Sequence, residues 1–166
     1  MRKIFTLAAI VLAAGLVCSC AKAPEEKAAA DAAVQSKEQA AGDIYEKLLS
    51  LQSDPVEMID VKGDMLMDFY GIDPADIADG VFGISVDNMR ADEFAVVRAA
   101  SEEAAGRLEQ KLKDRMQLKL QEATGYSPVQ ASIIKNSGVV REGLDLALIC
   151  GPDYESMKKA YEQMIR

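Results

Sequence analysis

Residues 94–123 read FAVVRAASEEAAGRLEQKLKDRMQLKLQEA, a strand pattern that runs directly into a helix pattern. Large apolar residues alternate over 94–99, which predicts a strand. Ser101 and the two glutamates after it are typical of a helix start, because a hydroxyl caps free N–H groups and acids favour the positive end of the helix dipole. One face of the helix is expected to be apolar, with residues three or four positions apart: Ala105, Leu108, Leu112, Met116, Leu120 and Ala123.

Three more strands are expected around the strand at 94–99. Residues 81–86 alternate in the same way and end at a polar loop. Two further strands, 132–141 and 144–150, flank a tight turn at Glu142-Gly143. Together the four strands are expected to form one mainly antiparallel sheet.

Shorter helices complete the pattern, each marked by apolar spacing or an acidic cap. Asp43 is expected to cap the first helix and Asp73 the third, where Pro74 suits the first helical position. The order of elements, α-(α)-ββ-α-ββ-α, predicts an α+β fold, with a mainly antiparallel sheet of about four strands packed against helices. The expected helices lie at 43–52, 65–70, 73–80 and 157–165.

Composition excludes several classes of chemistry. The 166 residues contain no histidine and no tryptophan, so neither a Ser-His-Asp or Cys-His nucleophile system nor a histidine metal site is available. The formal net charge of −8 argues against nucleic acid as a partner, because phosphate contacts need a basic face. No Gly-rich phosphate loop precedes a helix, and no cofactor is expected.

The N-terminus has the pattern of an export signal. Two basic residues precede an apolar run over 4–17, which is shorter than the roughly 20 residues of a membrane span but sufficient for a signal peptide. The run ends in LVCSC (16–20), which resembles a bacterial lipoprotein signal, where a small residue precedes the lipidated cysteine. We therefore expect residues 1–19 to be removed by cleavage after Ser19 and Cys20 to be lipidated. A plain secretory signal followed by a free cysteine is the alternative.

The rest of the chain divides into a tether and one domain. A diacylglyceryl group on Cys20 carries two acyl chains, enough for a stable attachment, so the membrane is the first expected partner. Residues 20–42 are rich in Ala, Glu and Lys, with Val34 as the only large aliphatic residue, and are expected to build no core. Residues 43–166 are long enough for a single α+β domain. Cys150 lies in an apolar run and is expected to be a buried, unreactive thiol.

Several short motifs give the chain a resemblance to a known family. They are Ala91-Asp92-Glu93-Phe94-Ala95-Val96-Val97, Arg115 in the long helix, Tyr126-Ser127-Pro128, Asn136 and the Gly143 hairpin. Spread over 65–164, these motifs resemble bacterial lipoproteins of the uncharacterised domain of unknown function 4358. The resemblance implies an exported, membrane-anchored domain without an established reaction.

Two roles, one structural and one catalytic, are open for the candidate site residue Glu93. If it shares a face with Ala95 and Val97, the helix over that face brings Arg115 to it, and the two form a buried ion pair with a structural role. The other interpretation is that Glu93 is a general acid or base. For the other residues that the resemblance carries, a structural and a functional role both stay open: Tyr126, Pro128 and Asn136.

A metal site is not expected from the acidic residues. Asp73, Asp76 and Asp79 could offer oxygen ligands to a hard cation, but helix capping explains the first two. Asp92 and Glu93 are adjacent in sequence before a strand and are expected to point to opposite faces, so they do not converge on one ion or proton unless the loop bends.

Three functions are consistent with these features. We expect a membrane-anchored, extracytoplasmic lipoprotein at the cell membrane, whose domain is a non-enzymatic binding module for an envelope protein or ligand. The first alternative is a small lipid-anchored enzyme that uses carboxylate chemistry at Glu93. The second alternative is a small-ligand-binding lipoprotein, which needs an apolar pocket of several hundred cubic ångströms.

Overall fold

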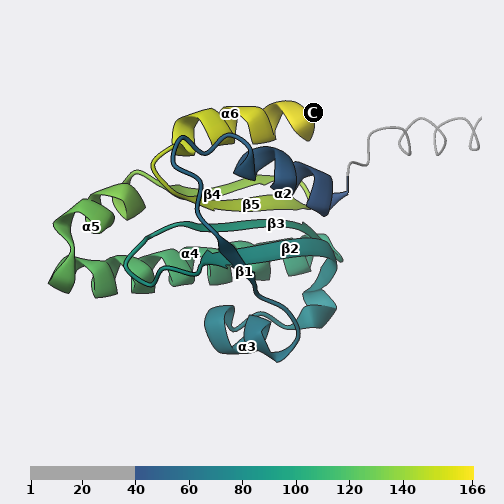
Figure 1. Ribbon diagram of the computed structural model, residues 1–166. Helices are drawn as coiled ribbons and strands as arrows, with labels where there is room; N and C mark the ends of the chain where they lie inside the picture. The colour runs from purple at the N-terminus through teal and green to yellow at the C-terminus, as the bar shows by residue number, and fades with distance from the viewer. Residues whose placement is uncertain (1–39) are drawn as a thin grey trace, which may run out of the picture. The chain divides into compact units, whose positions relative to one another are not determined.

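The structure is a computed structural model that describes residues 40–166 (Figure 1). The predicted signal peptide (1–19), its cleavage site at Ser19, the lipidation site Cys20 and the tether as far as residue 39 lie outside the described residues. The described part is α+β, as predicted, and five antiparallel strands form one sheet in the order β1-β2-β3-β5-β4. The strands are β1 Met58–Asp60, β2 Ile77–Ser85, β3 Glu93–Ala99, β4 Gly138–Glu142 and β5 Asp145–Cys150.

Helices cover both faces of the sheet. They are α2 Ala41–Leu49, α3 Asp64–Tyr70, the short 3-10 helix η2 Pro74–Asp76, α4 Glu102–Tyr126, α5 Pro128–Lys135 and α6 Tyr154–Met164. In Figure 1, α2 and α6 lie on one side of the sheet and α4 on the other, with α3 packed against α4. Side chains of β3 alternate between the two cores: Ala95 and Val97 lie under α4, and Phe94 and Val96 lie under α2 and α6. β3 is therefore the central, buried strand.

The strand register brings several loops to one end of the sheet. At this end, which we call the loop end, Glu93 of β3 pairs with Cys150 of β5 and with Ile84 of β2. At the opposite end, the N–H of Ala41 in the first turn of α2 donates to Asp79 Oδ2 over 2.8 Å. Residue 40 therefore joins the domain at the end opposite these loops. The loops at the loop end are 50–57, 86–92, 136–137 and 151–153.

The predicted strand over 132–141 is wrong in its first half. Residues Pro128–Lys135 form α5, and β4 begins only at Gly138. Ser127 Oγ accepts a hydrogen bond from the N–H of Gln130 over 3.4 Å, and the proline at the first helical position sacrifices no helical hydrogen bond. This helix start outweighs the local strand preference of the two isoleucines inside α5.

The sheet has five strands instead of about four. The additional strand, β1, has only three residues and pairs with the end of β2, from Met58 opposite Ser85 to Asp60 opposite Gly83. Three residues are too few to show an alternating pattern, so pairing with a longer strand is what defines β1.

The first residue of helix α2 differs from the prediction. The helix begins at Ala41, two residues before Asp43, and the residue at its N-cap position provides no side-chain hydrogen bond. The carboxylate of Asp79 accepts the Ala41 N–H instead. A residue distant in sequence therefore performs the role that capping-box spacing assigns to Asp43.

The acidic cap of η2 is confirmed, but its length is not. Asp73 Oδ1 accepts a hydrogen bond from the N–H of Ala75 over 2.9 Å, and Pro74 occupies the first helical position. The helical turn ends at Asp76 rather than at Gly80, because β2 begins at the next residue and pairs with β3.

The long helix and the hairpin are confirmed. α4 has 25 residues, Ser101 Oγ accepts a hydrogen bond from the N–H of Ala104, and the predicted apolar stripe faces the sheet. The β4–β5 turn contains Gly143 at a φ of 58°, which glycine adopts readily. Cys150 is buried, and burial raises the pKa of its thiol to about 12. No helix within residues 40–166 is both long and apolar enough to cross a membrane.

Candidate functional site

Glu93 begins β3 on the face covered by α4, and its side chain is fully buried. Arg115 of α4 donates to both carboxylate oxygens, with Nε–Oε1 and Nη2–Oε2 distances of 3.0 and 2.9 Å. One turn further along α4, Lys119 Nζ lies 2.9 Å from Glu93 Oε2. The predicted contact between Glu93 and Arg115 is therefore present, and Lys119 adds a second cation that the sequence pattern does not predict.

The surroundings of Glu93 keep its carboxylate ionised. Burial raises the pKa of Glu93, but hydrogen bonds and charges from Arg115 and Lys119 outweigh burial and hold the pKa below its ordinary value. A general acid or base at neutral pH needs a pKa near 7 and contact with its substrate. The Glu93 side chain has no exposed surface and two firmly bound cations, so the cluster suits a structural tie between β3 and α4.

Asp92 points to the other face, as the strand alternation predicts. Its Oδ1 and the ring of Phe94 both lie beside Gly151, and its Oδ2 accepts a hydrogen bond from Nε of Arg90 over 2.9 Å. Arg90 also reaches Asp54, with 2.6 Å between Nη1 and Oδ2. The hydrogen bonds to Asp92 and Asp54 raise the pKa of Arg90. Arg90 thus fastens the loop after α2 to the loop between β2 and β3.

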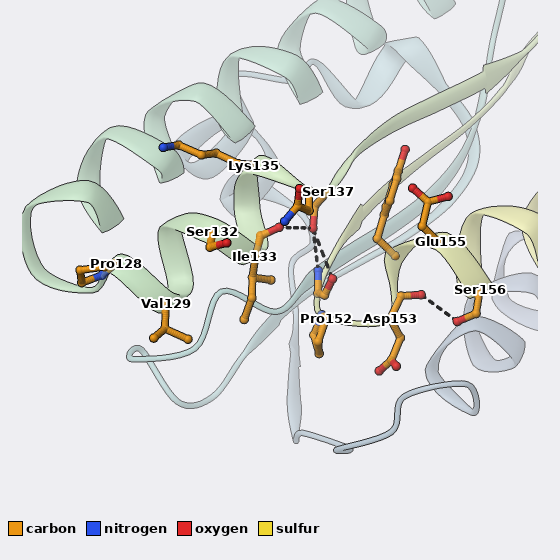
Figure 2. A pocket seen from close by; sticks show the side chains of 13 residues that line it. Pro128, Val129, Ser132, Ile133, Lys135, Ser137, Pro152, Asp153, Glu155 and Ser156 are labelled. Atoms are coloured by element: carbon orange, nitrogen blue, oxygen red, sulfur yellow. Dashed lines mark hydrogen bonds between the residues drawn. The ribbon is translucent and has the colours of Figure 1, made fainter.

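Two further contacts fasten the loop end. Asp153 Oδ2 accepts hydrogen bonds from the backbone N–H and the hydroxyl of Ser53, over 2.8 and 2.9 Å. Ser137 Oγ donates to the carbonyl of Ile133 over 2.8 Å and accepts the N–H of Gly151 over 3.1 Å (Figure 2). The end of α5 is therefore attached to the turn after β5 by hydrogen bonds within the domain.

An open cleft with a volume of about 1120 Å³ lies between α5 and the turn that leads into α6 (Figure 2). Val129 and Ile133 form apolar parts of the α5 wall, and Pro152 and Tyr154 belong to the opposite wall. Val129 is 69% exposed, so its side chain is available to a partner. Hydrogen-bonding and charged groups also line the cleft: Ser132, Lys135, Asn136, Asp153, Glu155 and Ser156.

The predicted site residues separate into two groups. Pro128, the first residue of α5, and Asn136, its C-cap, both line the cleft. Tyr126 at the end of α4 lines a smaller cavity of about 180 Å³ between α4, α5 and the β2–β3 loop, together with Arg115. Glu93 lines neither cavity and contacts Arg115 from the core side. The structure therefore does not bring all five residues to one site.

Most of the cleft does not follow from the sequence pattern, which predicts a strand over 132–141. In the helix, Ser132 and Asn136 are one turn apart and line the same cleft. The signal that identifies α5 is Ser127-Pro128, a capping residue followed by proline at the first helical position. The opposite wall comes from the turn after β5, and no sequence pattern indicates that it faces α5.

The acidic residues Asp73, Asp76 and Asp79 do not converge. Asp73 caps η2, and Asp79 accepts the N–H of Ala41. Asp76 pairs with Arg107, with 2.5 Å between Oδ1 and Nη2. In the described part of the chain, no group of three or more His, Cys, Asp or Glu residues is arranged to hold a metal ion.

The fold and the cleft define a small α+β domain. Its antiparallel sheet lies between helices, and an open cleft lies beside the hydrogen-bonded loops at one end of the sheet. Its sequence matches the family model described as Domain of unknown function (DUF4358) over residues 50–150, which is more than half of the chain. The chain therefore belongs to this family. No curated protein and no solved structure matches it. The family match includes α5 but ends before the second wall of the cleft.

Proposed function

We propose that the protein is a membrane-anchored lipoprotein on the extracytoplasmic face of the cell membrane, attached through a diacylglyceryl group on Cys20. The support is the apolar run that ends in LVCSC, with the small Ser19 before the cysteine. The 20 residues from Cys20 to residue 39 reach at most about 70 Å when extended, at roughly 3.3–3.6 Å per residue.

Mass spectrometry of the protein from native membranes tests the anchor. We expect Cys20 to be the first residue and to carry the diacylglyceryl group, and we expect the Cys20→Ala variant to leave the membrane fraction. Cys150→Ala is the matched control, since the other mature cysteine is buried and should not affect attachment. An unmodified, freely secreted wild-type chain would contradict the proposal.

The domain acts as a non-enzymatic binding module, and an envelope protein or ligand occupies the cleft between α5 and the start of α6. The observation that carries this proposal is the open cleft of about 1120 Å³, whose walls are fastened together by Ser137. Ligand sites typically combine apolar walls with a few convergent polar groups, and this cleft has both. The cleft lies at the loop end of the sheet, and Ala41 lies at the opposite end.

Site-specific photocrosslinking in cells tests the cleft. A photoreactive amino acid at Val129, on the cleft wall, is expected to capture one defined partner or ligand in the full-length, anchored protein. The control is the same probe at Ile59, which is 43% exposed on β1 and does not line the cleft. Equal products from both positions, or a Val129 product that survives Ser132→Arg, would contradict binding in the cleft.

A second candidate function, small-ligand binding, rests on a cavity of about 630 Å³ beside α3 and α4. Met67, Ile72 and Leu108 give it an apolar lining, and Arg107 with its partner Asp76 lies at the same cavity. Replacing Met67 by tryptophan fills the space without changing charge. We expect this variant to lose any small ligand that co-purifies with the anchored protein, whereas Val129→Trp at the cleft should keep it.

A further inference from the structure

The two edges of the sheet are protected to different degrees. β1 has three residues, follows Pro55 closely and carries Asp60, which pairs with Lys62 over 3.5 Å. β4 has five residues in regular register with β5, and it contains neither a bulge nor a proline. Proteins usually shorten, bend or charge an exposed edge, because its unpaired backbone groups would otherwise bind another strand. β1 is short and carries a charge, whereas β4 is longer and its two charged residues, Arg141 and Glu142, lie at the end next to the turn.

The arginine in β4 does not protect the edge either. Arg141 Nη2 lies 2.7 Å from Glu102 Oε2, and its Nη1 lies 3.2 Å from Glu109 Oε2, so the guanidinium is held against α4. Its Nε donates to the carbonyl of Gly143 over 2.9 Å. The charge is therefore neutralised on one face of the sheet and does not project along the open edge.

The hairpin geometry identifies which backbone groups of β4 are open. Glu142 and Asp145 pair on either side of the two-residue turn, and such a pair exchanges both backbone hydrogen bonds. Alternation then directs the backbone groups of Val140 toward β5 and those of Val139 and Arg141 outward. Within the described strands, the sheet order ends at β4, so these outward groups have no strand partner there.

We propose that β4 pairs in antiparallel fashion with β4 of a second copy of this chain, centred on Val140, so that the two sheets become continuous. In this register the outward N–H and C=O of Val139 bond to those of the partner's Arg141, and the reverse pair forms by symmetry. Val140 lies directly opposite the partner's Val140, a β-branched pair that packs well between strands. The proposal does not depend on the cleft being a binding site.

Charge selects this register, in which two copies of β4 pair without like charges opposite each other. Centring the pair on Arg141 would place two arginines opposite each other, which destabilises a strand pair. Centring it on Val139 would leave the outward groups of Arg141 beyond the partner strand. The proposed register places Glu142 opposite the partner's Gly138, where no like charge is present. β4 is therefore complementary to itself without any change in sequence.

The proposed pairing has a consequence for the cleft. Gly138 directly follows Asn136 and Ser137, which line the cleft beside Lys135. The partner's Glu142 lies opposite Gly138 and adds a carboxylate near this rim. Each copy in the dimer thus completes one margin of the other copy's cleft.

Disulfide trapping in native membranes tests the pairing. Directly opposed residues of this kind have Cα atoms about 4.5 Å apart, within the range that a disulfide needs. Under mild oxidation, the full-length chain with Val140→Cys is expected to form mostly a disulfide-linked homodimer. The matched control Ile59→Cys places an exposed thiol on the other edge and is expected to stay monomeric. Cys150 is buried in both proteins and does not contribute.

Proline variants separate edge pairing from random collision. Val139→Pro removes an outward N–H without removing a β4–β5 hydrogen bond, and it is expected to lower the Val140→Cys crosslink at least about tenfold. Asp60→Pro makes the same change on the outer side of β1 and should leave the crosslink unchanged, with circular dichroism confirming that both variants fold. A monomeric Val140→Cys chain, a crosslink to a different protein, or a crosslink that persists with Val139→Pro would overturn the proposal.

Discussion

The two faces of the sheet are stabilised in different ways. Under α2 and α6, Phe94 packs with Met157 and Tyr161, and all three side chains are fully buried. Under α4, the adjacent residue Glu93 is equally buried but is held by Arg115 and a lysine. Apolar packing loses part of its contacts when a side chain is shortened, whereas a buried ion pair leaves an uncompensated charge when one partner is removed. The α4 face therefore adds matched buried charges to its apolar stripe, whereas the α2–α6 face depends mainly on the shape of its apolar side chains.

The largest effect is expected for Glu93→Gln. This change leaves Arg115 and Lys119 without their anion, and it should lower the free energy of unfolding by about 3–5 kcal/mol. Urea unfolding followed by circular dichroism measures the loss. Replacing all three residues of the cluster by leucine should recover most of it, because no buried charge then remains unpaired. A Glu93→Gln protein with wild-type stability but lost turnover of some substrate would instead support carboxylate catalysis.

The next effect concerns the opposite face. Met157→Ala removes a fully buried side chain and should cost about 3 kcal/mol of stability, near the middle of the usual range for such truncations. Met157→Leu keeps most of the volume and should cost less than about 1.5 kcal/mol. Thermal and urea unfolding of the two Met157 variants show whether the stability of this face depends on the shape of its apolar side chains. A Met157→Leu loss as large as that of Met157→Ala would contradict the comparison.

Acid should destabilise the α4 face selectively. The pKa of Glu93 is lower in the folded protein than in the unfolded chain, so its contribution is complete above the unfolded value of about 4.3 and is lost as the pH falls through the folded value. Unfolding free energies measured between pH 7 and pH 3 should therefore fall more steeply for the wild type than for the all-leucine cluster variant. Equal slopes would mean that other carboxylates cause the acid sensitivity.

The smallest effect is expected on the outer side of α4. Lys113 is half exposed and pairs with Glu109 four residues earlier, so Lys113→Gln should cost only about 0.3–0.5 kcal/mol and less at high salt. Lys119→Gln, on the same helix but facing Glu93, should cost clearly more. Equal stability of the two lysine variants would show that burial does not increase the contribution of the Glu93 cluster to the free energy of unfolding.

Much of the fold was predictable where the side-chain pattern is long. β3 and α4 extend over many residues, so alternation and helical spacing each identify a buried face, and together they place Arg115 against Glu93. β1 was not predictable, because three residues carry too little pattern. α5 was misassigned, because in eight residues the isoleucines that favour a strand compete with the start signal at Ser127-Pro128.

The candidate site was less predictable than the fold. Pro128 and Asn136 were singled out from short motifs, but nothing local indicates that they face the turn after β5. The Ser137 hydroxyl joins these segments through Gly151, a residue 14 positions away. Asp153 likewise accepts hydrogen bonds from Ser53, 100 positions earlier. Contacts at such separations depend on the strand order and not on any local spacing.

The sequence by itself determined the α+β class, the main strand and helix, and the faces that they bury, because these follow from the periodicity of neighbouring side chains. Only the tertiary structure decided that Lys119 joins Glu93, that α5 and the α6 turn enclose a cleft, and that β4 lies at an open edge. These features arise when segments distant in the chain pack against one sheet, so their geometry exists only after the whole domain has folded.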